Sequence, residues 1–358
     1  MKRTSVKMIL LVSAAIISVI FGVGVGSVYI SPGDIFAILA NHLFGVPLPE
    51  TVSAVHSSMV MDLRLPRVLL AFCTGGALAV SGTVMQSVLK NPLASSYGLG
   101  VSAGAGLGAS LVMVAGLSSG ILGAFLLPAV SLSFGVATVF IVIGISSRID
   151  RGLSNVTIIL MGMIASLFFT AIMDMLATSS PENAQRINLW TLGSFSMRGW
   201  VGVHVLFPVT VLSLLVFLRY STEMDIMTFG EEQAQALGVD VRKSKRFLTA
   251  LVAILTGTAV AFVGIIGFVD LIAPHVVRRL VPLTVRCCQP LPYSAVHFWF
   301  CATWQPAPLS RRGKSPLAPS QLFWGRRFLF ISFFQDERGD RFVTDRTSQL
   351  RIWRRARR

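Results

Sequence analysis

The stretch "RLPRVLLAFCTGGALAVSGTVMQSVLKNPLASSYGLGVSAGAG", residues 64–106, decides the fold class. Within it, residues 68–88 are mostly apolar or small and include no charged side chain, whereas arginines precede the run and Lys90 follows it. A helix needs about 20 such residues to span the hydrocarbon core of a bilayer, because its backbone must satisfy its own hydrogen bonds there. The run therefore predicts a transmembrane helix.

The rest of the chain repeats this pattern. Of the 358 residues 53% are hydrophobic and 13% are charged, whereas soluble domains carry about 25% charged residues. We therefore expect an all-α fold, a polytopic membrane helix bundle, in which the apolar N-terminal segment is a first span and not a cleaved signal. The expected spans, the last of them short, are residues 8–30, 68–88, 98–115, 121–145, 156–177, 201–218, 247–269 and 271–281.

The basic residues predict the orientation of these spans. When the N-terminus is placed inside, 13 of the 17 Lys and Arg residues in residues 1–281 fall on the inner side. Loops on the cytoplasmic side of membrane proteins carry such an excess of positive charge. We expect a multi-pass protein with a cytoplasmic N-terminus.

Small residues are concentrated in "GVSAGAGLGAS", residues 100–110, where glycines recur at 100, 104 and 108. This spacing lets helix backbones approach closely, because packing drives helix association in lipid. It predicts tight helix packing in preference to substrate contact.

The residue pattern argues against two other function classes. We expect no charged residue in the middle of a span, which disfavours an ion-coupled secondary transporter. The clustered His and acidic residues of an integral membrane enzyme are absent from the sequence, as is the G-x-x-x-x-G-K-[ST] nucleotide loop. We therefore expect a chain that is no enzyme and has no cofactor and no metal site.

Composition changes abruptly near residue 281. Residues 1–281 hold 17 basic and 12 acidic residues, whereas residues 282–358 hold 14 basic and 4 acidic ones. Three of the four cysteines and four of the six tryptophans also fall after the break. The change predicts a transmembrane domain at 1–281 and a largely irregular tail at 282–358.

Three stretches carry a family resemblance: residues 64–106, residues 229–246 ("FGEEQAQALGVDVRKSKR") and residues 264–280 ("GIIGFVDLIAPHVVRRL"). With their R-L-P-R, S-G-x-x-x-Q, N-P-L-A and A-P-H elements in this order, residues 1–281 resemble the FecCD family. Its members are permease subunits of bacterial ABC importers for ferric siderophores, haem or vitamin B12. The resemblance implies ten spans, of which this chain has about eight, in the bacterial cytoplasmic (inner) membrane. Ferric siderophore is the leading substrate, with vitamin B12 or haem as the alternative.

The resemblance also implies partners and site residues. Arg64 and Arg67 would receive acidic residues of a periplasmic or lipid-anchored substrate-binding protein, since a guanidinium fork suits carboxylates; snorkelling anchors are the open alternative. A coupling helix that docks into the ATP-binding subunit would lie between two glycines, and its expected residues are Gly230, Glu231, Ala234, Leu237 and Gly238. Ala234 and Leu237 are expected on one face of it, and an interfacial helix on lipid headgroups is the alternative.

Further expectations concern the pore. Ser154 and Asn155 map onto the loop that narrows the cytoplasmic exit in the family, and a second permease subunit, identical or different, would complete the path within membrane lipid. The family usually has a glycine where this sequence has Asp270. We expect its carboxylate to lie at the outer interface or to impair helix packing.

The last two family spans are replaced by a tail outside the family pattern. Three stretches in it, residues 302–307, 313–318 and 323–329, can be back-translated so that one other reading frame spells D-L-A-A-R, E-I-P-V-G and L-G-A-P-F-F in the family order. This predicts a frameshift and a defective copy with an unstable bundle. The alternative is a genuine basic tail that binds lipid headgroups or RNA; on the frameshift interpretation no nucleic acid is a partner.

Overall fold

The computed structural model describes residues 2–280, apart from residues 27, 50, 51, 118, 119, 151 and 196–198. Helices and loops make up this part of the chain, which contains no strand. In chain order, the helices are α1 (Lys2–Gly24), α2 (Pro32–Phe44), α3 (Ala54–Ser58), the π-helix η1 (Met59–Arg64), α4 (Leu65–Val88), the 3₁₀ turn η2 (Tyr97–Leu99), α5 (Val101–Val114), α6 (Gly120–Ile149), α7 (Asn155–Ser179), α8 (Pro181–Thr191), α9 (Gly199–Arg219), α10 (Ser221–Thr228), α11 (Glu231–Ala236), α12 (Val241–Val263) and α13 (Val269–Leu280).

The prediction of an all-α membrane bundle is confirmed. Each expected span overlaps a helix: α1, α4, α5, α6, α7, α9, α12 and α13. The spans expected at 8–30 and 247–269 are displaced by six residues from α1 and α12. Within the described residues, five helical stretches are long and apolar enough to cross a membrane, and the apolar parts of α1 and α5 are shorter. The predicted tail at 282–358 and the end of the last expected span lie outside the described residues.

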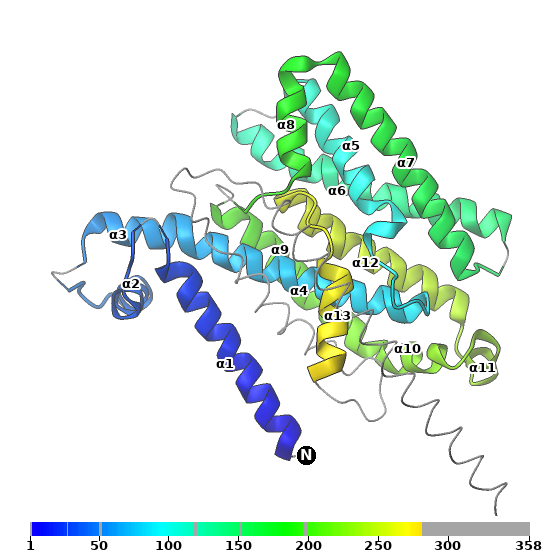
Figure 1. The fold of residues 1–358 in the computed structure, drawn as a ribbon, viewed down its shortest axis with the longest axis horizontal. Helices are drawn as coiled ribbons and strands as arrows, with labels where there is room; N and C mark the ends of the chain where they lie inside the picture. The colour runs from blue at the N-terminus through cyan, green and yellow to red at the C-terminus, as the bar shows by residue number, and fades with distance from the viewer. Residues whose placement is uncertain are drawn as a thin grey trace, which may run out of the picture.

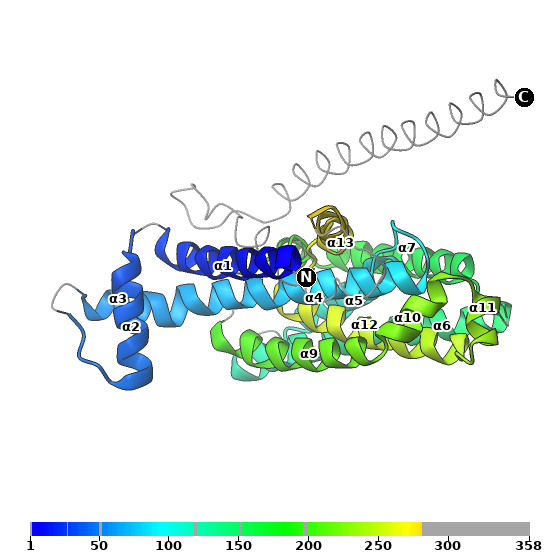
Figure 2. The same ribbon diagram turned by 90° about the horizontal axis from the view of Figure 1, so that it is seen from below.

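The helices α4 and α12 form the centre of the bundle. In the continuous run α3–η1–α4, 89% of the most apolar stretch is buried, and in α12 72% is buried, against 17% in α7. Figure 1 shows α5, α6, α7 and α8 on one side of this pair and α1, α2 and α3 toward the other. Seen from below, α4, α9 and α12 extend along the long axis of the molecule (Figure 2).

Glycines allow α5 and α6 to pack closely, as the sequence predicts. A Cβ on Gly104 would overlap the Thr138 hydroxyl, and a Cβ on Gly108 would lie 2.9 Å from the carbonyl oxygen of Val130. Both neighbours belong to α6. The interpretation of this glycine spacing as a helix-packing feature is confirmed.

The π-helix η1 changes the helical phase directly before α4. Because each π turn holds more residues than an α turn, it rotates the side chains that follow it. Trp200 of α9 donates from Nε1 to the carbonyl oxygen of Met61 in η1 at 3.0 Å. Pro66 follows in the first turn of α4, within this continuous helical run, where its missing N–H removes one helical hydrogen bond.

Apart from the coupling helix expected at residues 230–238, the short helices between the spans were not anticipated from the sequence. The helix α2 nevertheless has a readable start, since Ser31 accepts a hydrogen bond from the Asp34 N–H at 3.1 Å and Pro32 follows the cap. α8, α10 and α11 have at most 11 residues, too few to span a bilayer. Hydropathy alone therefore places them in connecting segments.

The last described helix, α13, crosses α4 steeply (Figures 1 and 2). Its Asp270 is fully buried, so the expected location of this carboxylate at the outer interface is wrong. Asp270 Oδ2 accepts hydrogen bonds from Ser95 Oγ at 2.5 Å, Ser96 N at 2.8 Å and Ser96 Oγ at 3.0 Å. Asp270 lies in the first turn of α13 and not in the middle of a span. Only folding brings its carboxylate to the serine turn at residues 95–96.

Candidate functional site

The guanidinium group of Arg64 is hydrogen-bonded to backbone carbonyls of this chain. Its Nη1 donates to the carbonyl oxygens of Val23 at 2.9 Å and Gly24 at 3.2 Å, and its Nη2 donates to that of Val28 at 2.5 Å. The first two carbonyls end α1, where helical carbonyls lack intrahelical partners and a cation is favourable. Arg64 thus connects α1 to η1, a structural contact that the sequence did not indicate.

Arg67 differs from Arg64 in its surroundings. It lies three residues further along, in the first turn of α4, and is exposed. Its guanidinium is therefore accessible to an acidic partner. The two arginines of the R-L-P-R motif therefore have different surroundings.

The segment 230–238 forms a compact turn of helix between two glycines. Gly230 has φ 141° and Gly238 has φ 85°, conformations that side-chain-bearing residues rarely adopt. Ala234 is buried against Met227 and Val241, whereas Leu237 is 67% exposed. The expectation that Ala234 and Leu237 share a face is wrong, because α11 ends at Ala236 and Leu237 follows in the turn.

An ion pair attaches this segment to α12. Glu231 Oε1 accepts a hydrogen bond from Lys245 Nζ at 2.6 Å, and the lysine side chain is almost completely buried. Nearby, Ser244 Oγ donates to Glu223 Oε2 of α10 at 2.8 Å. The start of α12 therefore holds both α10 and α11 in place.

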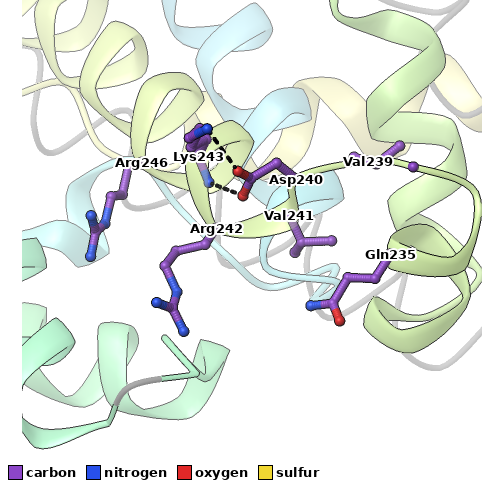
Figure 3. A pocket seen from close by; sticks show the side chains of 8 residues that line it. Gln235, Val239, Asp240, Val241, Arg242, Lys243 and Arg246 are labelled. Atoms are coloured by element: carbon purple, nitrogen blue, oxygen red, sulfur yellow. Dashed lines mark hydrogen bonds and ion pairs between the residues drawn. The ribbon is translucent and has the colours of Figure 1, made fainter.

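A basic pocket of about 550 Å³ opens beside α11. Gln235 and Gly238 line it from the α11 side, and Arg242, Lys243 and Arg246 line it from α12. Figure 3 shows Asp240 joined to Lys243, with Arg242 and Arg246 extending from successive turns of the helix.

The acidic residue at this pocket is held ionised. The Lys243 N–H donates to Asp240 Oδ1 at 3.1 Å and keeps the pKa of that carboxyl below its usual value. The pocket thus combines three basic side chains with one capping carboxylate, a lining suited to acidic groups. Within the described residues, no group of three His, Cys, Asp or Glu side chains could hold a metal ion.

The two residues expected at the gate lie where the loop between α6 and α7 meets α7: Ser154 ends the loop and Asn155 begins the helix. Ser154 is the N-cap of α7, and its hydroxyl accepts a hydrogen bond from the Thr157 N–H at 3.3 Å. Asn155 donates from Nδ2 to the carbonyl oxygen of Leu89, beyond the end of α4, at 2.9 Å. Both side chains fix the loop in place, and Asn155 connects it to the neighbouring span.

Asp150 organises the same loop. Its Oδ2 accepts from the Ser154 N–H at 3.0 Å and its Oδ1 from the Gly152 N–H at 2.8 Å. Hydrogen bonds from the Ser154 and Gly152 backbones lower the pKa of Asp150. Sequence analysis did not single out this residue.

Lys245 is the other site residue that sequence analysis missed, and a signal for it was present. The buried residues at the start of α12 are Val241, Ser244, Lys245 and Leu248, a spacing of i, i+3, i+4 and i+7 that marks one face of a helix. Lys245 lies on this face, within the run "RKSKR". The prediction of orientation used it only as one of the basic residues on the inner side of the membrane. A lysine on an apolar face predicts a buried partner.

The chain is similar in sequence to known membrane permeases. The sequence model of the FecCD transport family matches residues 14–297. The uncharacterized ABC transporter permease protein YvrB of Bacillus subtilis is 37% identical over 264 residues, covering 74% of this chain and 74% of YvrB.

Two further relatives have named substrates. The cobalamin import system permease protein BtuC of Halobacterium salinarum is 34% identical and covers 70% of this chain and 65% of its own length. The ferric enterobactin transport system permease protein FepG of Escherichia coli is 31% identical and covers 78% of this chain and 80% of its own length.

A solved structure is similar in fold. It is described as a metal-chelate type ABC transporter in an inward-facing conformation, and it superposes with a TM-score of 0.78 at 26% identity. The similarity covers 91% of this chain and 97% of the solved chain. Sequence and fold comparisons therefore identify the same class of membrane protein.

Proposed function

This chain belongs to the FecCD transport family, and from that premise we propose that it is the transmembrane permease subunit of an ABC importer. In this function it forms half of a conduit through the bacterial cytoplasmic membrane, with its N-terminus in the cytoplasm. A separate ATP-binding subunit hydrolyses ATP, and this chain makes and breaks no covalent bond. A second permease subunit and membrane lipid cover the exposed apolar faces of α7 and α9.

The observation that carries this proposal is the geometry of residues 230–238. Gly230 and Gly238 delimit a short helix that is anchored on its inner side by Ala234 and Glu231. Its outer side presents Leu237, 67% exposed, and Phe229, 73% exposed, directly before it. Exposed apolar side chains beside a basic pocket are suited to docking a protein partner. This surface is the proposed contact with the ATP-binding subunit.

Arg67, in the first turn of α4, is the proposed contact for the substrate-binding protein. Its exposed guanidinium is available for a carboxylate, whereas Arg64 positions the start of the span by holding the end of α1. Closure of the ATP-binding subunits would move residues 230–238 and shift the paired bundles between outward-open and inward-open states, a rigid-body change between two packings.

A ferric siderophore is the proposed substrate. The ferric enterobactin permease among the relatives and the metal-chelate type of the similar structure support it. Vitamin B12 is the alternative that the cobalamin relative supports, and haem is a further one. These substrates share a bulky chelated metal, which a path between two bundles can accommodate.

The tail is part of the proposal. We propose that residues 282–358 derive from a frameshift and leave this copy defective. The family match continues through residues 282–297 and ends before the three stretches at 302–307, 313–318 and 323–329, which can be back-translated so that another frame spells family motifs. Resequencing the gene tests this: a nucleotide sequence that cannot encode those motifs in any frame contradicts the frameshift.

A reconstituted transport assay tests the proposed function. The full chain and a version whose reading frame is restored after residue 281 are each expressed with the cognate ATP-binding subunit and binding protein. In proteoliposomes, uptake of a ⁵⁵Fe-labelled hydroxamate siderophore, haemin and cyanocobalamin is measured with and without ATP. We expect ATP-dependent siderophore uptake in the restored version and little in the full chain. No ATP-dependent uptake of any probe in either version contradicts the function.

A matched pair of substitutions tests the docking surface. Leu237→Glu places a charge in the proposed contact, and we expect it to reduce co-purification of the ATP-binding subunit about tenfold or more, since hot-spot residues contribute about 2 kcal/mol or more. Leu93→Glu is the control, because Leu93 is also a loop leucine and is 61% exposed. Equal co-purification of both variants contradicts docking through Leu237.

An ion-coupled secondary transporter is the second candidate function, and buried Asp270 favours it. Among the described residues its Oδ1 has no hydrogen-bond partner, and carboxylates inside membrane bundles often bind or relay ions. The same proteoliposomes distinguish the two functions. Uptake driven by a proton or sodium gradient in the absence of the ATP-binding subunit supports the second candidate.

A further inference from the structure

Lys245 occupies an unusual position for a lysine. It lies on the second turn of α12 and is 1% exposed. A buried ammonium group is strongly unfavourable unless it is paired and hydrogen-bonded. The acceptors of Lys245 therefore determine what this residue does.

The two acceptors of Lys245 belong to different parts of the chain. Nζ donates to Glu231 Oε1 at 2.6 Å and to the carbonyl oxygen of Leu153 at 3.0 Å. Glu231 is the first residue of α11, inside the proposed docking segment, and Leu153 belongs to the loop between α6 and α7. One ammonium group thus bridges segments 14 and 92 residues away from it.

The acceptor in the loop has a restrained backbone. Leu153 has φ 54° and is 1% exposed. A left-handed conformation is uncommon for a residue with a side chain and persists only where its surroundings impose it. The hydrogen bond from Lys245 to the Leu153 carbonyl is one such constraint, and the buried side chain is another. A change at Lys245 would therefore alter this peptide unit first.

The loop passes this constraint to its neighbours. Leu153 directly precedes Ser154, whose hydroxyl caps α7, and Asn155, which binds the Leu89 carbonyl beyond α4. Asp150 closes the loop through the Gly152 and Ser154 N–H groups. The loop is therefore a small hydrogen-bonded unit, and its position follows that of the Leu153 carbonyl.

We infer that Lys245 is the positioning residue that transmits movement of the docking segment to the loop that ends at Ser154 and to Asn155 at the start of α7. Movement of α11 displaces Glu231, the ion pair carries Lys245 with it, and the Leu153 carbonyl follows. The inference rests on the proposed function, because it requires an ATP-binding subunit to move α11. It adds a residue outside the docking segment and the loop, and it gives the route between them.

The test measures amide hydrogen exchange of residues 150–158 in the full chain bound to its ATP-binding subunit. Exchange is compared between the nucleotide-free and the vanadate-trapped complex, because it reports local opening of the loop. We expect a nucleotide-dependent difference in the wild type. Lys245→Met replaces the lysine by an apolar side chain of similar length. We expect it to abolish this difference while ATP hydrolysis and co-purification persist.

A second variant tests the route. Glu231→Gln should reduce the nucleotide-dependent difference, and the double variant Glu231→Gln with Lys245→Met should show no loss beyond Lys245→Met alone, since both changes interrupt one connection. Lys90→Met is the matched control. It removes an exposed lysine beyond the end of α4 and should leave the difference unchanged.

The outcomes separate this inference from the proposed function. A wild-type difference that Lys245→Met retains overturns the inference alone, as does additive loss in the double variant. Equal loss of protection in both nucleotide states, with a lower melting temperature, identifies Lys245 as a purely structural residue and also overturns it. If neither the full chain nor the version with the restored reading frame co-purifies with the ATP-binding subunit, the proposed function and the inference are overturned together.

Discussion

The backbone carbonyl oxygen of Asp270 occupies the space into which a Cβ on Gly82 would project, so α4 and α13 cross in direct backbone contact. Gly82 lies in the buried second half of α4, and Asp270 lies in the first turn of α13. Close approach of this kind requires glycine, because any side chain would force the helices apart. The crossing brings the Asp270 carboxylate to the serine turn at residues 95–96.

Gly82→Ala should destabilise the bundle by about 1–3 kcal/mol, the usual effect of overpacking. The added Cβ meets backbone atoms, which cannot rotate away as a side chain can. The free energy of unfolding in detergent, followed by thermal or denaturant melting, measures the effect.

Gly144→Ala in α6 is the control for this substitution. No atom lies within 4 Å of a Cβ at Gly144, so the change should be neutral or stabilising by about 0.5–1 kcal/mol, since alanine favours the helix. Equal melting of the two variants contradicts the described crossing.

Asp270→Ala should lower stability by about 1–3 kcal/mol, since it leaves the buried Ser96 N–H without its acceptor. Asp270→Asn keeps an acceptor oxygen and should retain most of the stability. Ser96→Ala combined with Asp270→Ala should cost less than the sum of the two changes, because the residues are hydrogen-bonded partners. Additive losses in the melting experiment would show that the two side chains act independently.

Arg64→Ala and Arg67→Ala should separate stability from partner binding. Arg64→Ala removes three hydrogen bonds, two to carbonyl oxygens at the end of α1 and one to that of Val28, and we expect a loss of about 1–3 kcal/mol. Arg67→Ala should change stability by less than about 0.5 kcal/mol, as for exposed sites, but should weaken binding of the substrate-binding protein. Melting and surface plasmon resonance measure the two effects. The reverse assignment of effects would contradict the described roles.

Asp150→Asn should reduce stability at neutral pH but not at acidic pH. The Ser154 and Gly152 N–H groups lower the pKa of Asp150 in the folded chain, so the carboxylate is stabilising above the usual Asp pKa of about 3.9. This contribution is lost as the pH falls through the lowered folded value. Melting of wild type and variant between pH 7 and pH 3 should show a difference at pH 7 that narrows as the pH falls below the usual Asp pKa. A difference in stability that stays constant with pH contradicts the stabilising role of the Asp150 carboxylate.

The spans illustrate what could be predicted from local pattern. Each expected span overlaps a helix because hydropathy over about 20 residues is a local property that the bilayer imposes. The same holds for the packing of Gly104 and Gly108 against α6, which depends on four-residue spacing. Prediction was wrong where a side chain's surroundings depended on folding, as for Ala234 and Leu237, which lie three residues apart in different environments.

The sequence by itself determined that this chain is an all-α membrane bundle of the FecCD family, because hydropathy and ordered motifs can be recognised without coordinates. Only the tertiary structure decided which polar groups meet. Arg64 binds the end of α1, Lys245 joins Glu231 to Leu153, and Asp270 meets Ser95 and Ser96 across 174 or more residues. The physical reason is that a buried charge must find its partners wherever the packed helices place them, and sequence separation carries no information about that distance.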